Sequence, residues 1–193
     1  MSDEVLTQDD DHRPVAGFFG KLPATGDFVW RGLPDAFRKA WDAWLTRHIA
    51  PLQRDGRVFP PAGLRFRLPS GGHLAAGVIL PCEDSAGRLF PLSLVLLADS
   101  DLSPGQIDLW CDAALVLRPA TLAPDPLWHA LDALPGADPQ GEVTGPMQLW
   151  GAGGPLLSCA SANPREALLQ LIAAKQDGPT QELSSPPDPP NSG

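Results

Sequence analysis

The chain has 193 residues, 43% of them hydrophobic and 19% charged, a balance typical of a folded domain with a hydrophobic core. The formal net charge is −9, and residues 1–13 and 176–193 carry most of it. No cluster of basic residues is visible, which excludes the electrostatic capture of nucleic acid or of an anionic membrane surface.

The start of the chain is polar and acidic, which is unlike a secretory signal peptide. No apolar run approaches the roughly 20 residues that a membrane-spanning helix needs. The cysteines Cys82, Cys111 and Cys159 are odd in number and far apart, so we expect reduced, buried thiols. Together these features predict a cytoplasmic protein.

The first third of the chain predicts one strand and one helix. Val15–Lys21 is short and largely apolar, as in a strand, and Leu22–Leu33 holds three Gly or Pro breakers, which indicates a loop. Pro34 suits a first helical turn, and apolar residues then recur at spacings of three and four up to Ile49. Pro51 is expected to end this helix.

Three strands with short links follow, which predicts an antiparallel meander. They are expected over Leu64–Leu68, Leu74–Leu80 and Leu89–Ala98. The first alternates apolar and basic residues (LRFRL), as in a half-exposed strand. Pro91 places the beginning of the third at an edge or a bulge.

The second half of the chain contains a well-marked helix start at Ser103. Pro104 takes the first helical position, and Gln106 completes a capping box. Three elements are expected further on: a helix over Asp125–Leu134, a closing hairpin of Met147–Trp150 and Leu156–Cys159, and a helix that Asn163, Pro164 and Glu166 cap and that runs to about Lys175.

Strands mixed with helices in one core predict an α/β or α+β sandwich, with a central sheet covered by helices. We expect a disordered acidic leader over residues 1–14, a single domain over 15–175, and a disordered Pro/Ser-rich tail over 176–193.

Signals for enzymatic chemistry or cofactors are weak. Gly17, Gly20 and Lys21 lack the spacing and the final hydroxyl residue of a phosphate loop. The four histidines are scattered, with no metal-ligand spacing, and no G-x-S-x-G is present. Neighbouring carboxylates would raise the pKa of the Cys82 thiol, which disfavours a nucleophile. We therefore expect no catalytic residues, no metal and no cofactor.

Two segments together resemble the TagF (ImpM) family of type VI secretion-associated proteins. The first is GFFGKLPATGDFVWRGLP, Gly17–Pro34, followed by the helix that carries Trp41 and Trp44. The second is GVILPCEDSAGRLFPLSLVL, Gly77–Leu96, with the pattern P-x-x-D-x-x-G-R-x-F-P-L. The similarity spans roughly residues 15–174. Cys82 departs from it, because the family usually has serine after the proline.

The resemblance implies a three-layer α/β/α sandwich with a mixed, largely antiparallel sheet. It also implies a non-catalytic, post-translational repressor of secretion-system assembly, which binds the forkhead-associated scaffold protein of the threonine-phosphorylation pathway. The candidate partner-binding residues in the two segments are Lys21, Asp27, Arg31, Asp84 and Arg88.

The motif residues have a structural and an interfacial interpretation. Asp27, Arg31, Asp84 and Arg88 are expected either to form a charge network that ties the first loop to the hairpin turn, or to present an Arg-containing rim to a partner. Gly26 and Gly87 are expected in turns with positive φ.

Two other functions remain open. One is a hydrolase or transferase that uses Cys82 or the Asp27 and Asp84 carboxylates, which predicts Cys82 near His73 or His129 in a pocket. The other is an adaptor of longin-like architecture for a nucleotide switch protein, which predicts an exposed apolar sheet edge or helix face.

Overall fold

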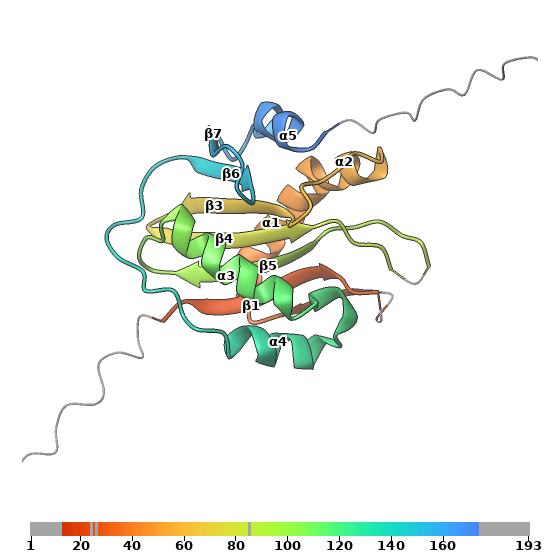
Figure 1. Ribbon diagram of the computed structural model, residues 1–193, viewed down its shortest axis with the longest axis horizontal. Coiled ribbons are helices and arrows are strands. Elements are labelled where there is room, and N and C mark those ends of the chain that lie inside the picture. Colours follow the sequence, from red (N-terminus) through yellow and green to blue (C-terminus); the bar gives the residue numbers. More distant parts are fainter. Residues whose placement is uncertain (1–12, 24, 26, 85, 174–193) are drawn as a thin grey trace, which may run out of the picture.

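The computed structural model describes residues 13–173 except 24, 26 and 85, and a seven-stranded sheet lies at the centre of this part (Figure 1). The strand order is β2-β1-β5-β4-β3-β6-β7, and neighbouring strands pair antiparallel throughout, so the expectation of a mixed sheet was wrong. The strands are β1 (Val15–Lys21), β2 (Phe28–Arg31), β3 (Leu64–Ser70), β4 (His73–Leu80), β5 (Leu92–Ala98), β6 (Met147–Gly151) and β7 (Leu157–Cys159). The helices are α1 (Asp35–His48), α2 (Ala50–Arg54), α3 (Pro104–Val116), α4 (Pro124–Asp132) and α5 (Arg165–Leu171), with a 3₁₀ turn at Pro119–Thr121.

Several sequence predictions are confirmed at this level. The first strand, the first long helix, the β3-β4-β5 meander and the β6-β7 hairpin form where expected. The capping box of α3 is complete, because Gln106 N–H donates to Ser103 Oγ and Ser103 N–H donates to Gln106 Oε1. Strong local signals of periodicity and capping determined these elements.

The predicted loop over Leu22–Leu33 is only partly a loop. Phe28–Arg31 forms β2, which pairs with β1 so that Lys21 lies opposite Phe28 and Phe18 opposite Arg31. The surrounding Gly and Pro residues favoured a loop. A four-residue strand of this kind depends on the neighbour with which it pairs.

Other boundaries differ by a few residues. Pro51 does not end the helical region, because it lies in the first turn of α2, where proline is tolerated. The strand expected from Leu89 begins at Leu92, and Leu89 forms only an isolated bridge with Glu83. The expected capping by Asn163 was wrong, since Pro164 precedes α5 without a side-chain cap. Lys175, residues 1–12 of the leader and the tail over 176–193 lie outside the described residues.

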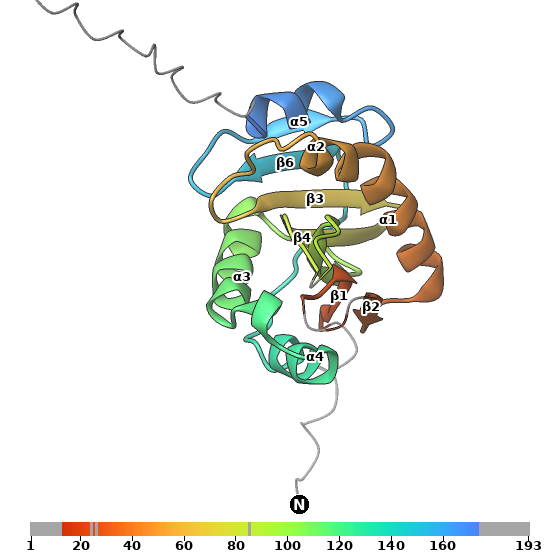
Figure 2. The same ribbon diagram turned by 90° about the vertical axis from the view of Figure 1, so that its right-hand side faces the viewer.

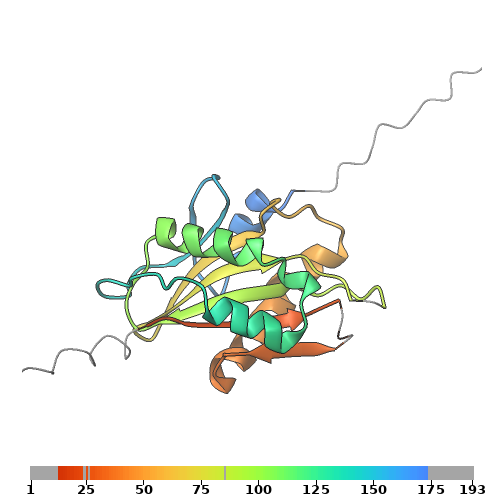
Figure 3. The same cartoon turned by 60° about the horizontal axis from the view of Figure 1, so that its bottom comes forward.

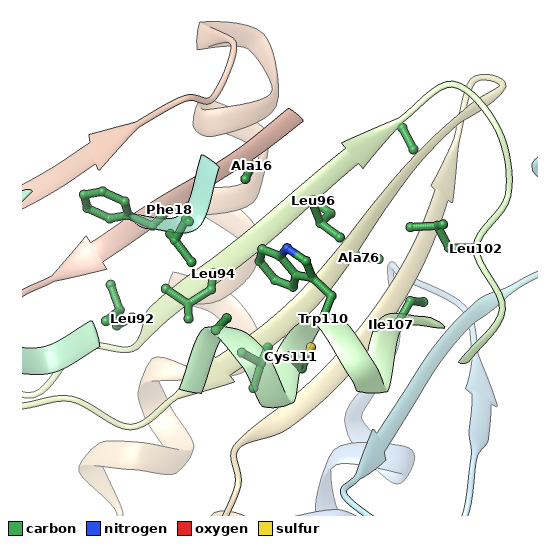
Figure 4. Close-up of a cluster of buried hydrophobic side chains, with 14 of the residues drawn as sticks. Ala16, Phe18, Ala76, Leu92, Leu94, Leu96, Leu102, Ile107, Trp110 and Cys111 are labelled. Atoms are coloured by element: carbon green, nitrogen blue, oxygen red, sulfur yellow. The ribbon is translucent and has the colours of Figure 1, made fainter. Parts of the chain in front are cut away.

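Helices lie on both faces of the sheet, with α1 on one face and α3 and α4 on the other (Figure 2). The side chains form two hydrophobic clusters that match these faces. One cluster joins Phe18 and Leu94 of the sheet to Trp110 and Cys111 of α3 (Figure 4). The other cluster packs α1, α2 and α5 against the opposite face. Both faces are therefore buried, which explains the nearly continuous apolar sequence of β4 and β5.

Trp41 anchors α1 to the sheet. Its ring is 2% exposed and stacks on Trp44 with centroids 5.0 Å apart. Its Nε1 donates to Ser93 Oγ at 2.9 Å, and Ser93 Oγ donates to the Phe19 carbonyl at 2.9 Å. The two hydrogen bonds satisfy the polar atoms that this packing buries.

The basic residues of β3 are buried, so the prediction of a half-exposed strand was wrong. Arg65 is 2% exposed and pairs with Asp108 and Asp112, which lie one turn apart on α3. Arg67 pairs with Asp101 and also donates to the Thr144 carbonyl at 3.0 Å. Alternation of apolar and basic residues fits either an exposed strand or a buried strand with paired arginines.

Candidate functional site

The two motif segments meet at one end of the sheet. β1 ends at Lys21, and β5 begins at Leu92, which lies opposite both Gly20 of β1 and Leu80 of β4. The chain therefore leaves β1 and connects β4 to β5 at the same end of the strands (Figure 1). Segments that are about 60 residues apart in the chain form one surface there.

Asp84 is the centre of this surface. Its carboxylate is fully buried, and its Oδ2 accepts from Lys21 Nζ and from Arg88 Nε, both at 2.8 Å. Its Oδ1 accepts the backbone N–H of Ala86 and of Arg88, at 3.0 and 2.9 Å. We call Lys21, Asp84 and Arg88 the Asp84 cluster. It ties the end of β1 to the β4-β5 loop.

The loop folds around this carboxylate by local geometry. Asp84 N–H donates to the Arg88 carbonyl, and Gly87 N–H donates to the Asp84 carbonyl. Gly87 has a φ of +76°, which confirms the expected positive-φ turn. Gly26, the other glycine expected in such a turn, lies outside the described residues.

The charge on Asp84 is strongly stabilised. The hydrogen bond from Lys21 is the largest cause that lowers the pKa of the Asp84 carboxyl well below its usual range, and the donors of Ala86 and Arg88 add to it. Burial of Asp84 opposes this effect without overcoming it. Asp84 is therefore ionised at neutral pH.

We expect Asp84→Asn to reduce the sensitivity of stability to acid. An aspartate in the unfolded chain has a pKa of about 3.9, and the pKa of Asp84 in the folded chain is lower. The ionised Asp84 therefore stabilises the fold fully above the unfolded pKa, and this stabilisation is lost as the pH falls toward the folded pKa. Denaturant unfolding at several pH values below about 4 should show a shallower loss of stability for the variant. Asp55→Asn, at an exposed aspartate, should keep the wild-type slope, and an unchanged slope in Asp84→Asn would contradict the assignment.

Aromatic side chains border the cluster. Lys21 Nζ lies 5.3 Å from the centroid of the Phe28 ring, and Phe28 makes an edge contact with Phe90 at 4.6 Å. Phe28 is 41% exposed and the Arg88 side chain 59% exposed. Arginine and aromatic side chains are enriched at protein interfaces, and this surface exposes one of each, Arg88 and Phe28.

Asp27 and Arg31 do not join the Asp84 cluster, so the expected four-residue charge network was wrong in part. Asp27 Oδ1 accepts the N–H of Phe28 at 2.8 Å. Arg31 Nε donates to Asp125 of α4 at 2.7 Å, and its NH1 donates to the Trp30 carbonyl at 2.7 Å. The ion pair that connects the end of β1 to the β4-β5 loop is made by Lys21.

Sequence reasoning missed two residues that shape this surface. Gln53 of α2 is buried, and its Nε2 donates to the Cys82 carbonyl at 2.5 Å, which holds the start of the β4-β5 loop. Phe28, inside the segment predicted as a loop, contacts both Lys21 and Phe90. For Phe90 there was a signal, since it belongs to the second motif; nothing local marks Gln53.

A cavity of about 420 Å³ opens beside Cys82, between the segment after α2 and the start of β5. Most of its lining residues are apolar in type, Arg57 is the charged one, and in the described part of the chain the lining includes no histidine. Burial raises the pKa of the Cys82 thiol, and the nearby Asp84 and Glu83 raise it further. This geometry does not support the prediction of a nucleophilic Cys82 beside a histidine.

The described residues hold no group of three or more His, Cys, Asp or Glu side chains that is arranged to bind a metal ion. The cysteines Cys82, Cys111 and Cys159 are free. Within the same part of the chain, no helix has the length and apolar character to cross a membrane.

Residues 17–123, more than half of the chain, match the model of the family described as TagF N-terminal domain, type VI secretion system-associated. The chain belongs to this family. Both motif segments and the Asp84 cluster lie inside the matched range, so the resemblance seen in the sequence is confirmed.

A solved structure extends the similarity in fold. The chain resembles the crystal structure of PA0076 from Pseudomonas aeruginosa PAO1, with a TM-score of 0.67 and 24% sequence identity, over 92% of this chain and 100% of that chain. This likeness covers the fold beyond residue 123. No curated protein matches the chain.

Proposed function

We propose that this TagF-family protein is a non-catalytic, cytoplasmic repressor of type VI secretion system assembly. It acts by binding another protein, the forkhead-associated scaffold of the system. The family supports the association with type VI secretion. The helices on both faces of the sheet support the three-layer α/β/α sandwich that the family resemblance implies.

The observation that carries the binding proposal is the Asp84 cluster. The buried Lys21–Asp84 pair holds the two motif loops together, and Arg88 extends from it with its side chain 59% exposed. A guanidinium held by a carboxylate loses less conformational freedom on binding than a free side chain, which favours a role as an interface anchor. We place Asp27 and Arg31 on the border of the same surface, along β2.

Titration calorimetry of the full chain against the forkhead-associated scaffold tests this proposal. We expect saturable binding in the micromolar range or tighter, and a loss of at least about tenfold in affinity for Arg88→Ala. Arg47→Ala, an exposed arginine on α1, should bind like the wild type. Because Lys21 still pairs with Asp84 in Arg88→Ala, the variant is expected to remain folded.

The possible outcomes test scaffold binding and the contact surface separately. Binding that Arg88→Ala leaves unchanged would make Arg88 structural and would reject the Asp84 cluster as the contact surface. Absence of binding between folded proteins would contradict direct capture of the scaffold.

A second candidate is the adaptor for a nucleotide switch protein. Two large apolar side chains of α3 are exposed, Leu109 at 73% and Val116 at 80%, and the edge strand β2 exposes Phe28 and Trp30. These are the features that the adaptor hypothesis predicts. We rank it second because the family places the chain with the secretion system.

A further inference from the structure

The outer edge of β2 is a second surface with its own chemistry. β2 ends the strand order on this side of the sheet, and among the described residues its pairing partner is β1. Figure 3 shows it at the lower border of the molecule. The side chains of Phe28 and Trp30 are 41% and 40% exposed there. An exposed edge of this composition is a template for pairing with another strand.

The register shows which backbone groups face outward. In an antiparallel pair, alternate residues exchange hydrogen bonds with the neighbour and the others point away. Phe28 N–H donates to Asp27 Oδ1, and the Trp30 carbonyl accepts from Arg31 NH1. The backbone N–H and C=O groups of Phe28 and Trp30 therefore point outward, while those of Val29 and Arg31 face β1, opposite Gly20 and Phe18.

Asp27 and Arg31 thus satisfy two of the outward groups of β2 within one chain. Asp27 occupies the N–H at the start of the strand, and Arg31 occupies the carbonyl near its end. They carry opposite charges and flank Val29 at equal distances along the chain. A strand with this arrangement is complementary to a copy of itself that runs in the opposite direction.

We propose that β2 pairs antiparallel with β2 of a second copy of this chain, with Val29 opposite Val29. This register follows from the outward residues, because Phe28 then exchanges hydrogen bonds with Trp30 of the second copy. Asp27 lies opposite Arg31 of the second copy, on a shared face of the joined sheet. Both opposite-charge pairs and aromatic pairs directly across strands are stabilising.

The pairing exchanges partners and leaves no backbone group of β2 unsatisfied. Phe28 N–H moves from Asp27 to the Trp30 carbonyl of the second copy, and the released Asp27 pairs with Arg31 of that copy. Two of the outward groups of β2 already have partners within the chain, and the strand has four residues. The gain from pairing is therefore small, and we expect a weak, reversible dimer in the micromolar range.

Sedimentation velocity of the full chain from about 1 to about 200 µM tests the proposal. We expect a concentration-dependent dimer in the wild type. Asp27→Arg and Arg31→Asp should each weaken it at least about tenfold, since each places two like-charged pairs across the two-fold axis. The double variant Asp27→Arg/Arg31→Asp restores opposite charges and should recover the dimer.

Asp125→Asn is the matched control. It removes the carboxylate that binds Arg31 within the chain, at 2.7 Å, and leaves β2 unchanged. We expect it to keep or tighten the dimer, because Arg31 becomes available to the second copy. Circular dichroism at each variant's working concentration checks that the charge reversals fold.

Three results would overturn the proposal. If the wild type stays monomeric at every concentration, β2 does not pair with β2 of a second copy. An extended segment of a different protein would then be the candidate for pairing with this edge. If neither single charge reversal weakens the dimer, the dimer uses another face of the molecule. If both single reversals weaken it and the double variant does not restore it, the proposed register is rejected. No scaffold protein is present in this experiment, so its outcome is independent of the proposed repressor function.

Discussion

Asp108→Ala is expected to destabilise the domain by about 3 kcal/mol. Asp108 accepts hydrogen bonds from the buried Arg65 guanidinium and from Trp150 Nε1, the latter at 2.7 Å. Removing it leaves a buried cation with one remaining carboxylate partner and a buried indole N–H without an acceptor, and losses of this kind are among the largest for single substitutions. Urea unfolding measures the difference in the free energy of unfolding between the variant and the wild type, provided that both have the same m-value.

Asp112→Ala is the matched control for this prediction. Asp112 lies one turn further along α3 and also pairs with Arg65, but its side chain is 64% exposed, and the Trp150 indole donates to Asp108 instead. Its loss should cost about 1 kcal/mol or less, because solvent screens the pair. Equal losses in the two variants would mean that the buried hydrogen bonds of Asp108 do not set the stability.

Gly77→Ala is expected to cost at least about 3 kcal/mol and to reduce the yield of folded protein. Gly77 lies in β4 with a φ of +149°, and a Cβ atom there would lie 2.0 Å from the Leu94 carbonyl oxygen of β5. This neighbour is backbone in the centre of the sheet, so relief requires separating two paired strands. Thermal and denaturant unfolding measure the loss.

Gly71→Ala is the matched control, because it tests the cost of a positive φ at a position where an added Cβ atom meets no neighbour. Gly71 also has a positive φ, +59°, but nothing lies within 4 Å of its Cβ position in the β3-β4 turn. We expect a cost of about 1 kcal/mol, the usual penalty for a left-handed alanine. If Gly77→Ala cost no more than Gly71→Ala, β4 and β5 would not be as closely paired as described.

The elements with strong local signals were predictable from the sequence. The helix over Asp35–His48 follows an apolar periodicity, and the start of α3 follows a capping box within four residues. The meander follows three apolar runs with short turns. The family motifs were also visible. They suggested that Asp84 and Arg88 belong to one charge network, and Arg88 Nε donates a hydrogen bond to Asp84 Oδ2.

The candidate site was only half predictable, because its partners are distant in the chain. Asp84 bonds to Lys21, 63 positions earlier, and Arg31 bonds to Asp125, 94 positions later. Both pairs of residues were available in the sequence, along with many other combinations of the same charges. Which carboxylate meets which cation depends on the strand order, which no local pattern specifies.

The sequence by itself determined the long helices, the β3-β4-β5 meander, the β6-β7 hairpin and the family motifs. The helices and hairpins depend on residues only a few positions apart, and the motifs are visible as written. The tertiary structure alone decided that Phe28–Arg31 is a strand, that Arg65 and Arg67 are buried, and that Lys21 completes the Asp84 cluster. These features depend on which distant segment lies alongside, since a short strand needs a neighbour and a buried charge needs a partner.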